Sequence, residues 1–393
     1  MIELKSRLAA VLLLAACCSP CIAIPQPASA LQFAAKAAED ERLPGSISPD
    51  DPKQIAELVD RFADKRAMFI GEVHDQLRHH QNQLRIIQAM YARYPDLAIG
   101  VEYFQQPFQR YLDDYIAGRI DEREMLVKTE YFKRWQIDYR LLRPIFAFAR
   151  EKHIPVLALN VPDEIHNKVF RWGMKSLTPE DRAQIPSYIE PASEHYLNRL
   201  QAIYGMHPPR NEFANFIDGV LLWDEAMADT AAHYLNAHPK SRIIMLAGMV
   251  HVMYGDGIPE RLDRQLGGNQ SIVTLNGNNF SSYPGVADYQ ITTGESQLLS
   301  KPGKLGITIV DGPAMNGMAG VRVTEFAPDS AAQDTGIEIG DRIVALDGVN
   351  VGSIPEVKSL MFDKLPGERV SVTIQRNMPN EASHEVKVDV VLR

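Results

Sequence analysis

Apolar residues recur in five short runs along the N-terminal two thirds of the chain, with longer stretches of helical periodicity between them. The runs cover residues 67–73, 97–104, 154–161, 242–250 and 271–275. Nearly continuous apolar strands that alternate with helices are typical of a parallel sheet covered by helices on both faces. The pattern therefore predicts an α/β fold with a mainly parallel sheet.

The pattern changes further along the chain. The stretch between residues 105 and 235 is longer than one crossover connection requires, and its Tyr- and Glu-rich segments predict a helical subdomain over the sheet edge. Turn-forming residues dominate 284–302, which predicts a linker between a first domain at 51–283 and a small β-rich domain at 303–393. Alternating strands of this second domain are expected at 306–310, 320–326, 341–348, 369–376 and 385–392.

The N-terminus has the pattern of an export signal. Lys5 and Arg7 precede an apolar run at 8–16 that is too short to cross a bilayer, so a signal peptide is expected over 1–23 and a flexible leader over 24–50. Residues 14–17 resemble the lipobox of bacterial lipoproteins, in which Cys17 is acylated. Cleavage after Ala23 or Ala30 is the alternative. Acylation would anchor the chain to the periplasmic face of a bacterial membrane without spanning it.

Charge and cysteine usage exclude several classes of function. The net charge is −9, and no basic face is available for phosphate contacts, which argues against a nucleic-acid partner. All three cysteines lie at or before residue 21. The folded part therefore has no disulfide framework, no Cys-based zinc site and no thiol nucleophile.

Polar residues stand at the ends of several predicted strands, where parallel sheets bind their ligands. The strand ends bring Glu72 and His74, Glu102 and Tyr103, Asn160, and His251 to one edge of the sheet. The convergence of Glu72, His74 and His251 from separate strand ends predicts a ligand or catalytic site. Such a set can ligate a metal or a haem iron, or act as a general acid–base pair.

The polar residues near this set in the sequence are expected to have different surroundings and roles. His80 shares a helix face with Leu77 and Leu84 and is expected just below the site, whereas His79 is expected to face solvent. Asp224 or Glu225 is expected to hydrogen-bond a site histidine. Structural roles are the alternative for two residues: Asn160 as an ordinary buried polar group, and Glu102 as the group that holds His74 or a helix N-terminus. His195, His207 and His238 receive no functional role.

The first domain resembles the ChaN-like haem-binding family, within the superfamily that also holds the Tiki proteases and erythromycin esterases. The resemblance rests on the segments 71–87, 100–104, 135–150, 157–162, 223–228 and 247–262. It implies an α/β fold, export as a lipoprotein, and haem binding linked to iron uptake at a dimer interface. The motif residues that it carries over are Glu72, His74, His80 and His251. The family's axial tyrosine has no motif here, so Tyr103 and Tyr254, beside motif residues, are the candidates, and Glu102 completes the expected haem site.

Relatives in the superfamily are hydrolytic, which implies an alternative use of the same residues. In that case Glu72, His74 and His251 would be catalytic, with His74 and His251 binding a divalent metal.

The second domain resembles a bacterial PDZ domain of the HtrA type. The likeness lies in residues 304–309, 320–351 and 365–376. Such domains add the carboxyl-terminal peptide of a partner as an extra strand, here an envelope protein. The peptide carboxylate is expected on the backbone of Leu305, Gly306 and Ile307. An intramolecular or dimer contact is the alternative role of this domain.

Three functions follow from these observations. The first is an exported haem-binding protein of iron uptake whose PDZ domain docks it to an envelope partner. The second is an exported metal-dependent peptidase or esterase. The third is an envelope scaffold that has lost activity.

Overall fold

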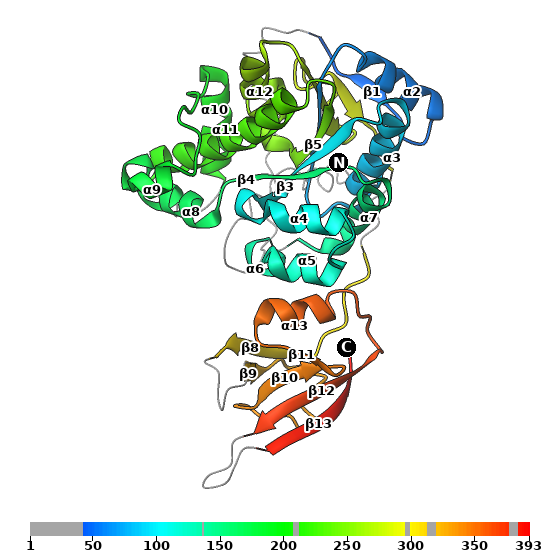
Figure 1. Cartoon of the computed structure of the whole chain (residues 1–393), viewed down its shortest axis with the longest axis vertical. Helices are drawn as coiled ribbons and strands as arrows, with labels where there is room; N and C mark the ends of the chain where they lie inside the picture. Colours follow the sequence, from blue (N-terminus) through cyan, green and yellow to red (C-terminus); the bar gives the residue numbers. More distant parts are fainter. Residues whose placement is uncertain (1–41, 136, 207–211, 295–298, 313–319, 377–383) are drawn as a thin grey trace, which may run out of the picture. The chain divides into compact units, whose positions relative to one another are not determined.

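The computed structural model describes residues 42–135, 137–206, 212–294, 299–312, 320–376 and 384–393. These residues form two compact units (Figure 1). The first unit comprises residues up to 119 and 141–297, and the second comprises residues 120–140 and 298–393. We call residues 120–140 the insert, because they interrupt the first unit in sequence but fold with the second. The predicted signal peptide and Cys17 lie outside the described residues.

The described strands of the first unit form one parallel sheet in the order β1-β7-β6-β2-β5-β3-β4. Their bounds are β1 (Gly45–Ile47), β2 (Ala67–Glu72), β3 (Leu97–Gln105), β4 (Val156–Asn160), β5 (Arg242–Gly248), β6 (Ser271–Asn276) and β7 (Tyr289–Ile291). The five predicted strands are confirmed as β2 to β6, and so is the α/β fold. The central strands β2, β5 and β3 are adjacent, so the polar residues at their carboxyl ends meet.

Helices surround this sheet, with α8 to α11 gathered beside its β4 edge in Figure 1. Their bounds are α2 (Pro52–Arg61), α3 (Leu77–Arg93), η1 (Gln106–Phe108), α4 (Gln109–Ile116), α7 (Arg143–Lys152), α8 (Asp163–Trp172), η3 (Met174–Ser176), α9 (Pro179–Arg182), α10 (Glu194–Gly205), α11 (Phe213–Ala237), η4 (Met249–His251), η5 (Met253–Gly255) and α12 (Ile258–Leu266). Helix α10 packs on α11 through its own small apolar cluster around Tyr196 and Phe216. The predicted helical subdomain is thus present beside the edge strand.

Burial explains why β2 reads as an unbroken apolar run. Phe69 joins the core cluster that includes Trp223 and Met227 of α11, while its neighbours Met68 and Ile70 point to the other face and are equally buried. A strand covered on both faces has no position where a polar side chain meets water until its end. Glu72 is the last residue of β2, and it stays buried because His74, His80 and Gln83 surround its carboxylate.

The second unit is an antiparallel sheet in the order β13-β12-β10-β9-β8, with β11 paired to β10. Its elements are α5 (Glu122–Lys128), α6 (Tyr131–Arg134), η2 (Tyr139–Leu141), β8 (Ile307–Asp311), β9 (Val321–Phe326), β10 (Arg342–Leu346), β11 (Val349–Asn350), α13 (Ile354–Met361), β12 (Arg369–Arg376) and β13 (His384–Val391). The alternating residues Val321, Val323, Val370, Val372 and Ile374 form its core. The five strands predicted here are confirmed, and β8 is an edge strand among the described residues.

Two predicted boundaries were wrong. The leader expected over 24–50 overlaps β1, and the linker expected over 284–302 overlaps β7. β7 pairs with β6, and β1 pairs with β7, both in parallel, so these two short strands extend the sheet at this edge. Within the described residues, no helix has the length and apolarity needed to cross a membrane.

Candidate functional site

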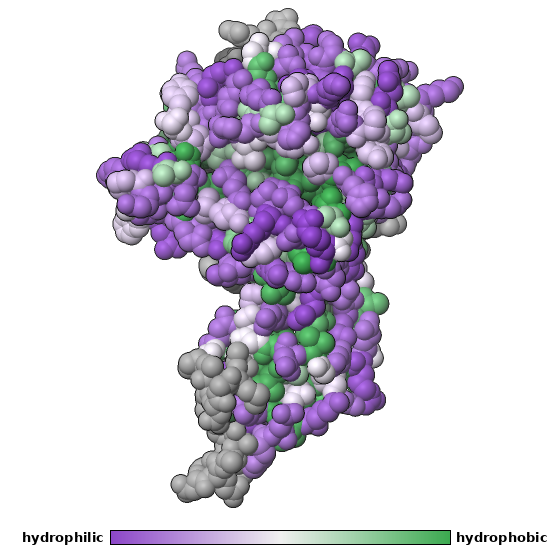
Figure 2. Space-filling model, in the orientation of Figure 1, coloured by the Kyte–Doolittle hydropathy of each residue, from purple (hydrophilic) through white to green (hydrophobic). Residues whose placement is uncertain are grey.

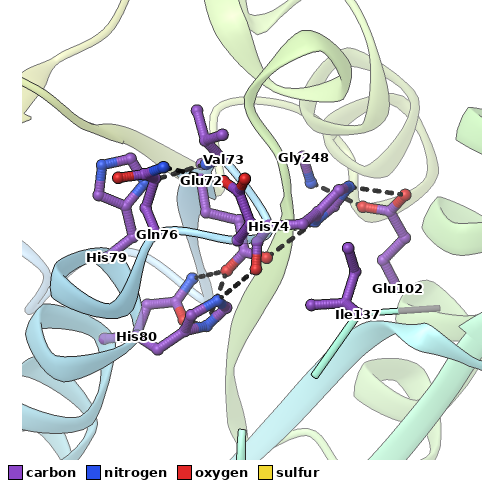
Figure 3. Close-up of polar contacts among 12 residues, drawn as sticks. Glu72, Val73, His74, Gln76, His79, His80, Glu102, Ile137 and Gly248 are labelled. Atoms are coloured by element: carbon purple, nitrogen blue, oxygen red, sulfur yellow. Dashed lines mark hydrogen bonds and ion pairs between the residues drawn. The ribbon is translucent and has the colours of Figure 1, made fainter. Parts of the chain in front are cut away.

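The carboxyl end of β2 carries a buried acidic centre, Glu72. One of its oxygens lies 2.9 Å from Nδ1 of His74, and the other accepts a hydrogen bond from the Gln83 amide. His80, one turn into α3, lies 3.4 Å from the same carboxylate and donates from Nε2 to the His74 carbonyl at 2.9 Å. Figure 3 shows these residues converging from β2 and α3. His80 thus lies below the site, as predicted.

His74 continues this network toward β3. Its Nε2 faces Glu102 Oε1 at 3.9 Å, and Figure 3 shows the ring between Glu72 and Glu102. Glu102 is fixed by the Gly248 amide of β5, which donates to Oε2 at 2.6 Å. A Cβ on Gly248 would lie 3.2 Å from the His74 ring, so the absent side chain gives the imidazole room to pack against β5.

His251 approaches Glu102 from the other side. Its Nε2 lies 3.9 Å from the same Oε1, and its Nδ1 lies 2.7 Å from Asp224 of α11. The Tyr196 hydroxyl of α10 donates to the other Asp224 oxygen at 2.5 Å. The expectation that Asp224 or Glu225 holds a site histidine is confirmed for Asp224. Glu225 instead accepts from Arg264, Gln265 and the amide of Glu190.

The charges of this cluster follow from its pairing. Burial alone would raise the pKa of Glu72, but the neighbouring His80 and His74 lower it to about 2. Burial would lower the pKa of His74, but Glu102 and Glu72 raise it to about 9. Burial opposes protonation of His251 as well, and the Asp224 carboxylate raises its pKa above the ordinary value. At neutral pH the His74 imidazole is therefore protonated beside ionised Glu72.

Exposure separates His74 from its neighbours. The side chain of His74 is 12% exposed, compared with 2% for His251, 1% for His80 and 0% for Glu72. Among these groups, His74 is the one that reaches the surface, so a ligand that enters from solvent meets it first.

Three other predicted positions have the following surroundings. His79 does not face solvent, which corrects the prediction: it is 6% exposed and accepts a hydrogen bond on Nδ1 from the Val73 amide. Asn160 donates to the Glu102 carbonyl and accepts from the Val161 amide, and these contacts fit its structural reading. The Tyr103 ring meets the His74 ring edge-on at 6.0 Å, and its hydrogen bond to Glu72 contributes to the low pKa of that carboxyl.

Tyr254 lies in a second buried cluster. Asp256 pairs with Arg199 through both oxygens and lies 2.9 Å from His195 Nδ1. The Tyr254 ring lies 4.6 Å from the His195 ring, and its backbone has φ +62°, a left-handed conformation that costs about 1–3 kcal/mol in a non-glycine residue. Its hydroxyl has no hydrogen-bond partner among the described residues, and burial raises its pKa to about 12. None of the described contacts joins Tyr254 to His74.

Several residues of these networks were missed from the sequence. Gln83 lies three residues after His80, a helical spacing that could have placed it beside Glu72. Tyr196, Arg199 and the pairing of His195 with Asp256 join helices and loops distant in sequence, and no local signal marks them. Across the described residues, no group of three or more His, Cys, Asp or Glu is arranged to hold a metal ion. The predicted metal site at His74 and His251 therefore has no support.

The turn before β8 forms the candidate peptide site of the second unit. Gly306 has φ +72°, and a Cβ there would lie 2.5 Å from the Ser330 Cα. The Leu305 carbonyl accepts from the Ala332 amide, and the Gly306 carbonyl accepts from the Ala327 amide. These bonds hold the backbone of Leu305, Gly306 and Ile307 at the start of the edge strand β8, where an added strand can pair.

Residues 58–262 match the family described as haem-binding uptake, Tiki superfamily, ChaN. The match spans more than half of the chain and contains Glu72, His74, Glu102 and His251. The chain belongs to this family. Its ChaN-like domain also resembles the solved structure titled cofacial heme binding to ChaN of Campylobacter jejuni, at 16% identity and a TM-score of 0.47, over 61% of this chain and 89% of that one.

Residues 303–390 match the PDZ domain. The chain is 30% identical over 88 residues to a probable periplasmic serine protease do/HhoA-like of Haemophilus influenzae, covering 22% of this chain and 18% of that protein. It therefore spans less than a fifth of that relative. The serine endoprotease of Yersinia pestis is similar at 24% identity and a TM-score of 0.19, over 23% of this chain and 28% of that chain. The predicted combination of a ChaN-like domain and a PDZ domain is confirmed.

Proposed function

We propose that this protein binds haem at the carboxyl edge of the ChaN-like sheet, where His74 would hold the iron, and that it serves iron or haem uptake in the bacterial envelope. The single observation that carries the placement is the exposure of His74 in a cluster whose other histidines are buried. Membership of the haem-binding family supports the ligand.

The residues around His74 fit an axial histidine. Nδ1 lies against the Glu72 carboxylate, which fixes the orientation of the ring and increases the electron density at Nε2. Haem iron would bind Nε2 in its unprotonated form, and Glu102 Oε1 lies 3.9 Å from that atom. Bound haem would supply an iron centre whose chemistry is set by this ligand. Tyr103 is the predicted tyrosine that lies beside His74, whereas Tyr254 is assigned to the second cluster.

Figure 2 shows an apolar area on the surface of the first unit. In that view the surface of the first unit is mainly polar, but apolar residues show in its middle, where Figure 1 draws β3, β4 and β5. A porphyrin gains affinity by covering such surface.

Absorbance titration with haem tests the proposal, using protein that lacks residues 1–30. The wild type should give a saturable Soret shift that His74→Ala abolishes or strongly weakens. His233→Ala is the matched control, because His233 is 78% exposed on α11 and its loss would reveal haem that adheres to surface histidines. An equal shift in all three proteins would contradict the placement at His74.

The proposed location is the periplasmic face of a bacterial membrane, with Cys17 acylated. The lipobox-like residues 14–17 support it. Cells fed radiolabelled palmitate should label the wild type and Cys18→Ser but not Cys17→Ser. An unlabelled wild type would instead favour cleavage after Ala23 or Ala30.

The PDZ domain is proposed to bind the carboxyl-terminal peptide of an envelope partner along β8. The edge position of β8 and the turn at Gly306 support this role. The homodimer implied by the family resemblance stays a prediction. The metal-dependent hydrolase is not proposed, because the described part of the site has no metal-binding group.

A further inference from the structure

The insert folds against the PDZ helix. Its helices α5 and α6 lie beside α13, as Figure 1 shows within the second unit. The insert is nevertheless part of the ChaN-like domain in sequence, since it connects α4 to α7. One compact unit is therefore built from two segments that belong to different domains by sequence.

Aromatic residues form the contact between the insert and α13. The Phe132 ring of α6 lies 5.4 Å from the ring of Phe362, at the end of α13, and the Tyr139 ring lies 6.1 Å from it. Tyr131 meets Tyr139 edge-on at 5.4 Å. The Lys358 ammonium of α13 donates to the Phe132 carbonyl at 3.4 Å. Edge-on and tilted pairs at these separations are the favourable geometries of aromatic side chains.

The insert also has internal bonds that define one conformation. The Tyr131 hydroxyl donates to the Ile137 carbonyl at 3.0 Å, and Arg134 pairs with Glu130 at 2.8 Å. Arg140 donates to the Ser300 carbonyl at 2.9 Å, which ties the end of the insert to the segment that leads into the PDZ domain. The insert therefore has contacts with the PDZ part of the unit at more than one point.

Both ends of the insert continue into elements that support the haem site. Its start follows α4, which is separated from β3 by the short η1, and its end continues into α7. Helix α7 packs on α3, the helix that carries His80 and Gln83. The chain therefore joins the insert at one end to α4 and at the other to α7, and both helices belong to the unit that holds the site.

We propose that α13 of the PDZ domain is an intramolecular docking surface for the insert, and that haem affinity depends on this docking. The second part rests on the proposed haem function. An undocked insert would have to be ordered when haem binds, and that ordering lowers the affinity. The PDZ domain then has two interaction surfaces, the β8 edge for a partner peptide and the outer face of α13 for its own chain.

Three variants of the protein without residues 1–30 test the docking by hydrogen exchange and haem titration. Phe362→Ala and Phe132→Ala each remove one side of the ring pair, and the double variant should add little to either, because both remove the same contact. Leu365→Ala is the matched control, since Leu365 is an exposed apolar residue of the same unit. Amides of α5 and α6 should exchange about fivefold faster in the ring variants, with haem Kd raised by a similar factor.

Protection of β12 and β13 must stay as in the wild type, which shows that the PDZ core is intact. Unchanged exchange in α5 and α6 would overturn the docking. Faster exchange with unchanged haem affinity would overturn the dependence of haem binding on it. A wild type that binds no haem would instead contradict the proposed function, and the exchange data would still decide the docking.

Discussion

Asp224 and His251 lie 27 residues apart in sequence, yet Asp224 Oδ1 is 2.7 Å from Nδ1 of His251. Glu72 stands in the same relation to His74, with a separation of 2.9 Å. Each histidine thus has a carboxylate on Nδ1, and both direct Nε2 at the same oxygen of Glu102 at 3.9 Å. The site is a pair of oriented imidazoles on either side of one carboxylate.

The first prediction concerns the Asp224 carboxylate. Asp224→Asn keeps the size of the side chain but removes the charge that raises the pKa of His251, so that pKa should fall. Tyr196→Phe is the control, because it removes a hydroxyl from Asp224 and keeps the carboxylate. An NMR titration of the His251 ring measures the change. A His251 pKa that is equal in Asp224→Asn and the wild type would refute this cause.

Glu102 is expected to control how the free energy of unfolding falls at alkaline pH. The pKa of His74 is raised to about 9, chiefly by Glu102, from an ordinary value of 6.5. Below pH 6.5 His74 is protonated in both the folded and the unfolded chain, and its full contribution to the free energy of unfolding is present. This contribution is lost as the pH rises through 9, because the folded chain then releases the proton as well. The loss is on the order of 3 kcal/mol at most.

In Glu102→Gln the free energy of unfolding should fall less steeply with rising pH, because the pKa of His74 then lies closer to its value in the unfolded chain. Urea unfolding at pH 6, 7.5 and 9 measures the slope in both proteins. Equal slopes in the wild type and the variant would show that Glu102 does not control the proton on His74.

The sequence predicts the strands of the sheet and several residues of the site, because burial shapes the pattern of each strand. Strands buried on both faces, such as β2, leave an unbroken apolar run, and a polar residue can follow it only at the strand end. This reasoning places Glu72 at the end of β2 and His251 just after β5, whereas Glu102 lies within β3, three residues before its end. The reasoning fails for β1 and β7, because each has three residues, too few to show a pattern, and each joins the sheet by pairing with another strand, β1 with β7 and β7 with β6.

Side-chain partners are harder to predict than strand ends. His79 was expected in solvent because helical spacing placed it away from His80, but the Val73 amide at the strand end needs an acceptor and His79 provides it. The docking of the insert on α13 depends on rings more than 200 residues apart in the chain, Phe132 and Phe362, which no periodicity can relate.

His166 is expected to lower the free energy of unfolding as the pH becomes acidic. It is buried, stacks on Trp223 with ring centroids 3.8 Å apart, and its Nε2 has no partner among the described residues. Burial lowers its pKa to about 3. Between pH 6.5 and 3 the unfolded chain binds a proton that the native state does not, so stability falls as pH falls through this window.

His166→Phe keeps the stacking and removes this proton, so its stability should decline less than that of the wild type from pH 7 to pH 5. His79→Phe is the contrasting variant, because it leaves the buried Val73 amide unpaired and should cost about 1–3 kcal/mol at pH 7. Urea unfolding at both pH values measures the effects. An acid decline in His166→Phe as steep as that of the wild type would rule out His166 as its source.

The close packing of Gly306 against Ser330 can be tested by substitution. Gly306→Ala places a Cβ 2.5 Å from the Ser330 Cα and also requires φ +72°, whereas Gly348→Ala requires φ +78° with no heavy atom within 4 Å. Both variants have the left-handed backbone cost of about 1 kcal/mol, but Gly306→Ala adds a collision with backbone that cannot move aside cheaply. Thermal unfolding of the PDZ domain should therefore show the larger loss of stability in Gly306→Ala. Equal losses would mean that the segment before β8 is free to shift away from Ser330, and that the peptide carboxylate site is not preformed.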